Sequence, residues 1–413
     1  NWVDEVKAII SYQHIDESRH TREYRRYDRF DHRFERVNVW GATLDIKKKW
    51  RSHEFTSGLD WQYNDVHSSA KRENIITKTE SKLDTRYPDG ENKMAYAGVY
   101  AQHQVSFFND KFLINDGIRF QAINLYSVID DNTFYNFPVT TIRQVNNAIT
   151  GNLGFAYIPG KRTRATASLA TAYRAPNIDD LAKIFESNGA AKQLIIPNPD
   201  LKPEHTVSVD AGLRQQLATN VIAEITAYYT AFQNAIVVSP FQINGADSVL
   251  YNGSMSKVFA SQNKNEAFLY GFSANTTIKI VDRLKLYSAI NYTYGRVKNG
   301  DKTTSPLDHI PPLTGKTSLT YTPPGIHTEF FVLYNGWKHL KDYSNSGEDN
   351  LQYATARGMP AWATYNFRIS FSTFYRFQVQ AAIENLFDKN YRLFASGFSA
   401  PGRNFLIALR KSF

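Results

Sequence analysis

A two-residue alternation of apolar and polar side chains runs along almost the whole chain, and it constrains the fold more than any other feature. Segment 206–214 shows it clearly, with Val207, Val209, Ala211 and Leu213 alternating with Ser208, Asp210, Gly212 and Arg214. Successive side chains of a β-strand point to opposite faces of its sheet. The pattern therefore predicts a strand with one apolar and one polar face.

The same alternation occurs at 221–230, which ends on an aromatic pair, and at 363–372. Aromatic residues make up 14% of the 413 residues, yet the mean hydropathy is only -0.44. No apolar run is long enough for a transmembrane helix. Many apolar side chains that alternate closely with polar ones are typical of a barrel with an apolar outside and a polar inside. We therefore predict an all-β fold, a transmembrane antiparallel β-barrel.

Short and long connections alternate between the predicted strands, as in barrels with tight periplasmic turns and long external loops. The short ones carry turn-forming residues and fall at 109–110, 159–161, 218–220, 281–282 and 323–325. The long ones are expected at 19–33, 64–93, 129–146, 174–203, 239–266, 298–311, 339–361 and 388–402. Counting the strands between these connections gives about sixteen. We therefore assign residues 1–413 to one barrel domain. A propeller or repeated sandwich would need internal repeats, which the sequence lacks.

Several function classes are disfavoured by composition. Cysteine is absent, which removes thiol catalysis and disulfides. The net charge of +9 is scattered along the chain without a recognition helix or RNA-binding signature, so nucleic acid is not an expected partner. Lipopolysaccharide phosphates or an anionic ligand fit this charge better. Asp179 and Asp180 are adjacent in a predicted loop and no catalytic motif occurs, so we expect no enzyme activity.

The two ends of the chain also carry information. Residues Asn1 to Asp4 lack the features of a signal peptide, so we expect such a segment upstream. The last strand alternates through Phe405, Ile407 and Leu409 and ends on Phe413. This ending resembles the C-terminal signature of outer-membrane proteins.

Three groups of local sequence resemble TonB-dependent outer-membrane receptors, particularly those of Bacteroidetes in the haem and siderophore receptor group. They are Ile383–Tyr391 with Pro401–Phe405, Tyr173–Pro176 with Asn198–Glu204, and Ser11–Gln13 with Glu17–His20. The family has a 22-stranded barrel preceded by a globular plug. The resemblance thus implies that the plug and the first strands lie upstream of residue 1, and that this chain is the C-terminal part of the barrel.

The resemblance also implies a function, which is active uptake of a scarce nutrient, an iron chelate such as haem or a ferric siderophore. The energy would come from the TonB-ExbB-ExbD system through the missing plug. A passive porin of about sixteen strands is the main alternative. A receptor for cobalamin or another small ligand, and a surface adhesion or secretion protein, also stay open.

Candidate ligand-binding residues follow from the second motif pair, which the resemblance places at an external loop. They are Tyr173, Arg174, Asn198, Asp200 and His205. Haem receptors of the family carry an iron-ligating His between the two motif halves, whereas residues 177–197 contain none and His205 is the nearest. Arg174 could face an anionic ligand, pair with a carboxylate of the plug, or form an interior ion pair at the base of the loop.

The predicted first loop is the densest cluster of basic and aromatic residues, and Arg25 and Tyr27 are further candidates for capturing a carboxylate or catecholate. Interleaved acidic residues favour a charged, solvated rim slightly more. Single histidines also occur in or near the loops, namely His14, His20, His32, His67, His309 and His339. No fixed ligand spacing joins them, so we predict no metal site and no cofactor.

Overall fold

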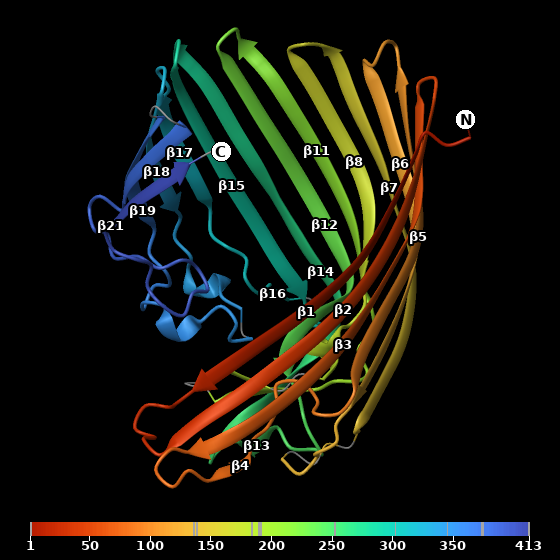
Figure 1. Ribbon diagram of the computed structural model, residues 1–413, viewed down its shortest axis with the longest axis vertical. Helices are drawn as coiled ribbons and strands as arrows, with labels where there is room; N and C mark the ends of the chain where they lie inside the picture. Colours follow the sequence, from red (N-terminus) through yellow and green to blue (C-terminus); the bar gives the residue numbers. More distant parts are fainter. Residues whose placement is uncertain are drawn as a thin grey trace.

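The computed structural model describes residues 2–134, 137, 139–182, 185–188, 192–251, 253–301, 303–344, 346–372 and 376–411. Sixteen long strands pair in the order of the sequence, each antiparallel to the next (Figure 1). They are β1 (Glu5–Thr21), β2 (Arg29–Trp50), β3 (His53–Asn74), β5 (Asn92–Phe107), β6 (Phe112–Val128), β7 (Thr141–Gly160), β8 (Thr163–Arg174), β11 (Glu204–Ala218), β12 (Val221–Pro240), β14 (Ser254–Val281), β15 (Leu284–Lys298), β17 (Thr314–Tyr321), β18 (Ile326–Asn335), β19 (Trp362–Ser372), β20 (Phe377–Glu384) and β21 (Asn404–Lys411).

The long strands form one sheet that curves around a central space, with β1 and β21 as its edges in the described part of the chain (Figure 1). Shorter elements lie in the loops, namely β4 (Glu80–Lys82), α1 (Ile178–Leu181), β9 (Phe185–Asn188), β10 (Gln193–Ile196), β13 (Ser248–Tyr251), β16 (Thr304–Pro306), η1 (Leu340–Asp342) and η2 (Leu351–Tyr353). The predicted all-β antiparallel barrel of about sixteen strands is confirmed. The final residue of the predicted terminal signature, Phe413, lies outside the described residues.

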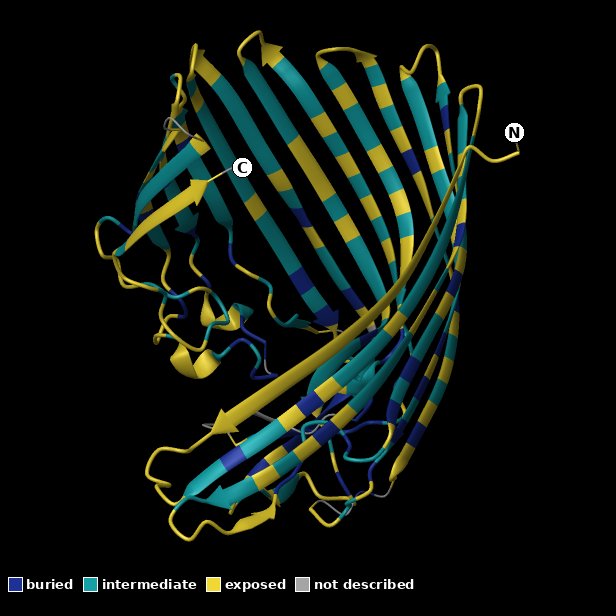
Figure 2. Cartoon of the chain, in the orientation of Figure 1, coloured by how far each residue is buried: buried dark blue, intermediate teal, exposed yellow. Residues whose placement is uncertain are grey.

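The two faces of each strand differ as the alternation predicts. On β11, Val209 and Leu213 are 51% and 45% exposed on the outer face. On the inner face, Asp210 accepts a hydrogen bond from Ser168 of β8, and Ser208 shares one with Thr230 of β12. The alternating stripes of exposure in Figure 2 show this pattern on strands between β1 and β21, whereas these two edge strands are exposed almost throughout.

Two outward tryptophans on β2 mark the limits of the membrane band. Trp40 and Trp50 lie on the same face, with Ala42, Leu44 and Ile46 between them and Lys48 next to Trp50. At a rise of about 3.4 Å per residue and a strand tilt of about 40°, the stretch between them spans about 25 Å, the height of the apolar band in such barrels. Strand β2 continues beyond Trp40 to Arg29, so its loop end lies outside the membrane.

Short turns join the strands at one end of the sheet, including those at 109–110, 218–220, 281–282 and 323–325, as predicted. The long loops at the other end are shorter than predicted, because the strands continue beyond the membrane. β3 extends to Asn74 and β14 begins at Ser254, and the first loop covers only residues 22–28. These extensions pack against the loops, as Val258 and Ala260 of β14 do, and no longer divide lipid from the barrel interior. The apolar and polar alternation that identifies a membrane strand is therefore lost there.

Among the described residues, no helix is both long and apolar enough to span a membrane.

Candidate functional site: the external loops at the barrel mouth

The loop between β8 and β11 folds onto the barrel wall and packs there. Leu181 and Leu201 of this loop are buried in one apolar cluster with Met94 of β5, Leu125 of β6 and Ile142 of β7. Helix α1 is held by a capping box, in which the Asn177 side chain accepts from the backbone of Asp180. Three strands therefore position this loop, which carries the candidate motif pair.

Arg174 forms ion pairs at the base of this loop. Its Nη1 lies 2.6 Å from Asp180 Oδ2, and its Nε lies 3.6 Å from Glu204 Oε1. Glu204 is the direct cross-strand partner of Arg174, so the pair joins β8 to β11 where the loop leaves them. Of the three roles left open by the sequence, the structure contains the ion pair at the base of the loop, and ligand binding by Arg174 stays a prediction.

Asn198 is buried and bridges the loop to β14. Its Nδ2 donates to the backbone oxygen of Ser261 at 2.7 Å, and its Oδ1 accepts from the Asp200 backbone at 3.2 Å. β10 also pairs in parallel with β14, from Gln193 to Ile196. Asn198 thus helps to hold the loop on β14, whereas the Asp200 side chain is exposed. Ligand binding by these two residues stays a prediction.

Tyr173 and His205 are cross-strand partners, and their rings lie 5.2 Å apart. By strand alternation they share the side of Leu169 and Val207, opposite to Arg174, and Tyr173 also packs against the apolar cluster of the loop. The motif residues are therefore adjacent but divided between two faces of the sheet. Ligand binding by Tyr173 and His205 stays a prediction.

Arg25 and Tyr27 lie in the first loop, at the tip of the β1–β2 hairpin, which extends to the lower left of Figure 1 beside β3 and β4. Tyr27 is 66% exposed, and the Arg25 guanidinium stacks on the exposed Tyr24 ring at 5.4 Å. Both side chains are available to solvent. Their role in capturing a ligand stays a prediction.

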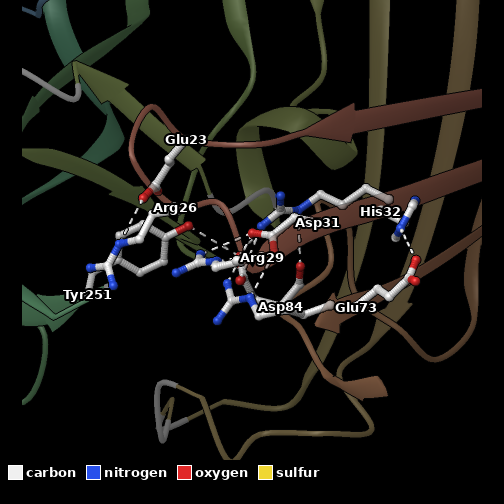
Figure 3. A network of polar contacts seen from close by, with 10 residues as sticks. Glu23, Arg26, Arg29, Asp31, His32, Glu73, Asp84 and Tyr251 are labelled. Carbon is white, nitrogen blue, oxygen red and sulfur yellow. Dashed lines mark hydrogen bonds and ion pairs between the residues drawn. The ribbon is translucent and has the colours of Figure 1, made fainter. Parts of the chain in front are cut away.

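Below that loop lies a charge network that the sequence did not reveal (Figure 3). The buried Asp31 carboxylate accepts from Arg72 Nε at 2.7 Å and from Arg29 Nη2 at 3.0 Å. Burial alone raises the pKa of Asp31, but hydrogen bonds from Arg72 and Arg29 outweigh it and lower the pKa to about 2. The carboxylate stays ionised and ties β2 to β3 outside the membrane.

A second part of the network connects loops that are distant in the sequence. Arg33 Nη2 lies 3.2 Å from both carboxylate oxygens of Asp84, which also accepts from the Tyr251 hydroxyl at 3.3 Å (Figure 3). Tyr87 donates its hydroxyl to Asp179 at 3.0 Å. The loops after β3, β8 and β12 are thereby joined into one assembly at the mouth.

A cavity of about 590 Å³ lies between residues 82–89 on one side and residues 129–134 with Phe137 on the other. Its wall combines Ser68, Asp84, Tyr87 and Phe137 with an ion pair between Lys82 and Asp131, 2.6 Å apart. This volume falls within the range of small-molecule sites. The mixture of aromatic, hydroxyl and charged groups can bind a polar ligand that has an apolar face.

A curved antiparallel sheet with an apolar outer band, a polar inner face and loops of unequal length at its two ends defines an outer-membrane β-barrel. The comparisons with known proteins narrow this class. The family model described as "TonB dependent receptor-like, beta-barrel" matches residues 1–386, and the chain belongs to this family. It is a protein of the bacterial outer membrane.

One curated relative is the iron-regulated outer membrane virulence protein of Vibrio cholerae serotype O1, 23% identical over 249 residues. The match covers 59% of this chain and 36% of that protein, so the chain spans about a third of the relative's length. Among solved structures, the copper transporter OprC has a TM-score of 0.80 at 17% identity, covering 100% of this chain and 62% of that one. The unliganded ferric citrate transporter FecA has a TM-score of 0.70 at 12% identity, with 97% and 58% covered.

The structural likenesses show the fold, and the family match confirms the resemblance stated from the motifs. The likeness to receptors of Bacteroidetes stays a prediction, as do the 22-stranded barrel and the upstream plug.

Proposed function

We propose that this chain is the barrel part of a TonB-dependent receptor that imports an iron chelate, either a ferric siderophore or haem, across the outer membrane. The match of residues 1–386 to the receptor barrel family carries this proposal. It is supported by the name of the Vibrio cholerae relative, which is iron-regulated, and by the ferric citrate transporter among the structural neighbours. The chelate is cargo, and no resident cofactor or catalytic step is part of the proposal.

The mouth of the barrel is where the ligand would first bind. Loops that are joined through Arg33, Asp84 and Tyr251 present a preorganised surface, which lowers the entropy cost of capturing a ligand. The exposed Arg25 and Tyr27 would add charge and stacking from the hairpin tip. Lipopolysaccharide is the proposed neighbour of the basic outer rim.

Release into the periplasm would require energy from the TonB-ExbB-ExbD system, delivered through a plug. The inner wall of the barrel is polar, with ion pairs such as Arg119 with Asp60, and is suited to a hydrated or protein-filled interior. A passive porin would instead conduct solutes without an energy source.

Uptake of iron-55 chelates by iron-starved cells tests the proposal. Wild-type cells, a strain lacking this protein and a strain lacking TonB are compared with ferric siderophores and haem, and labelled cobalamin is included as a third ligand. We expect saturable uptake of one iron ligand that is lost in both deletion strains. Uptake that persists in the strain lacking TonB would favour the alternative of a passive porin. Uptake of cobalamin alone would exclude an iron chelate as the cargo.

A further inference from the structure

Two histidines face each other across β1 and β2, on the hairpin that carries the first loop. His20 and His32 are direct cross-strand partners, and their Nδ1 atoms lie 2.8 Å apart. We propose that this pair binds a divalent transition-metal ion, with Cu²⁺ as the best fit, on the extracellular outer wall of the barrel. This site is separate from the proposed ligand mouth.

The position of the pair follows from the alternation along β2. His32 lies on the same face as Trp40, which marks the outer limit of the membrane band, and it lies beyond Trp40 toward the loop. Asp31 and Arg33 point to the opposite face, into the charge network of the mouth. A metal ion at His32 is therefore outside the membrane and on the other side of the sheet from that network.

The two Nδ1 atoms are separated by a distance that suits two adjacent ligands of one metal ion. Two nitrogens 2.8 Å apart subtend an angle of about 90° at an ion bound at about 2.0 Å from each. This is the angle between adjacent ligands in the tetragonal sites of Cu²⁺ and Ni²⁺. A tetrahedral Zn²⁺ site would need a separation of about 3.3 Å at the same bond length.

A second histidine pair in the protein provides a contrast. His53 Nδ1 and His103 Nε2 lie 2.9 Å apart, with nearly parallel rings at 15° and centroids 5.2 Å apart. His103 also contacts Asp116 at 3.1 Å through its other nitrogen, so this pair belongs to a hydrogen-bonded chain. The rings of His20 and His32 are turned 70° from each other and their centroids are closer, at 4.9 Å. Among the described residues, the second ring nitrogen of His32 has no hydrogen-bond partner, so this pair does not continue into a hydrogen-bonded chain through His32.

The surroundings of His32 are those of a metal ligand. Its Nε2 is buried, has no hydrogen-bond partner among the described residues, and lies 3.6 Å from Glu73 Oε2. A ligating imidazole commonly directs its second N–H at a carboxylate, which fixes the tautomer that leaves the first nitrogen free for the metal. Phe30 packs against the His32 ring at 4.4 Å, and Phe34 packs against His20 at 5.7 Å. Both rings are therefore held in place.

Imidazole nitrogen suits copper, nickel and zinc, and affinity for such ligands is highest for Cu²⁺. The described residues contain no cluster of three or more His, Cys, Asp or Glu that could hold a metal ion. Water would therefore complete the coordination. A bound ion would join β1 to β2 near the tip that carries Arg25 and Tyr27.

The test is titration of the full-length protein in detergent with Cu²⁺, followed by electron paramagnetic resonance. We expect a tetragonal Cu²⁺ spectrum with nitrogen ligands that saturates at one ion per chain. His20→Ala and His32→Ala should each weaken this binding by at least about 10-fold, and Glu73→Gln by about 10-fold. His14→Ala is the matched control, because His14 is exposed on the same face of β1 but contacts Asn38 and Asp16 instead.

Equal Cu²⁺ binding by the wild type and His20→Ala would overturn the proposal. So would a wild-type spectrum without nitrogen ligands, which would mean that the histidines form a hydrogen-bonded pair only. His20→Ala decides the question if His32→Ala does not fold, because His20 is exposed whereas the His32 side chain is 13% exposed.

Discussion

Arg119 and Asp60 form a two-pronged ion pair across an intervening strand, and the pair passes directly over Gly98. The Arg119 nitrogens Nη1 and Nη2 lie 2.6 and 2.8 Å from the two carboxylate oxygens of Asp60. Asp60 is on β3 and Arg119 on β6, while Gly98 lies between them on β5. A Cβ atom at residue 98 would stand 2.2 Å from Arg119 Nη2. The absence of a side chain at Gly98 is therefore what lets the guanidinium reach the carboxylate.

Gly98→Ala should displace the Arg119 side chain and break the ion pair in the barrel interior. Hydrogen bonds to charged groups contribute about 1.5–3 kcal/mol, so we expect a loss of stability of about this size. Thermal unfolding in detergent, followed by circular dichroism, measures it. Gly160→Ala is the control, because nothing lies within 4 Å of a Cβ atom there. Equal melting temperatures for the two variants would show that Arg119 adapts without losing Asp60.

Asp84→Asn should loosen the loops at the barrel mouth. The substitution removes the charge that holds Arg33 in place and weakens the contact with Tyr251. Backbone hydrogen exchange should become faster by about 10-fold or more in residues 83–91 and 248–251, which corresponds to a local loss of about 1.4 kcal/mol. Asp110→Asn, in a short turn at the other end of the sheet, should leave both segments unchanged. Unchanged exchange in the Asp84 variant would mean that packing alone orders these loops.

The contact between Asp131 and Lys82 should weaken in acid. A hydrogen bond from Lys82 and others from Thr133 lower the pKa of the Asp131 carboxyl from 3.8 to about 2. A lowered pKa means that this contribution to stability is present above about pH 4 and is lost as the pH falls through about 2. Pepsin should therefore cleave residues 129–134 faster as the pH falls from about 4 to about 2. This increase should exceed the change in pepsin's own activity over the same pH interval. In the Asp131→Asn variant, the cleavage rate should follow the change in pepsin's own activity alone.

Asn198→Ala and Asp200→Ala should separate a structural role from a ligand-binding role within one motif. Asn198→Ala leaves the buried backbone oxygen of Ser261 without its donor, at a cost of about 1–3 kcal/mol, and should expose the loop to trypsin. Asp200→Ala should leave trypsin cleavage unchanged, because the Asp200 side chain is exposed. If Asp200 binds the ligand, its variant alone should reduce affinity while the fold is preserved. Equal affinity in the Asp200 variant and the wild type would remove Asp200 from the candidate site.

The strands and their faces could be predicted from the sequence because alternation is a local property. Val207, Val209 and Leu213 take the outer face without reference to any distant residue, and Ser208 and Asp210 take the inner face. The same rule could have placed Tyr173 and His205 on one side of the sheet and Arg174 on the other. The loop lengths were overestimated, because beyond the membrane neither face needs to be apolar and the pattern ends before the strand does.

By itself, the sequence determined an antiparallel barrel with its inner and outer faces, and its motifs indicated the receptor family. Tertiary structure alone decided which distant side chains meet, as with Arg33 and Asp84 at the mouth or His20 and His32 on the outer wall. Alternation depends only on neighbouring residues, whereas these contacts depend on the register between strands and on the path of each loop. A shift of one residue in register would turn every side chain to the other face, so only the assembled sheet fixes which side chains face each other.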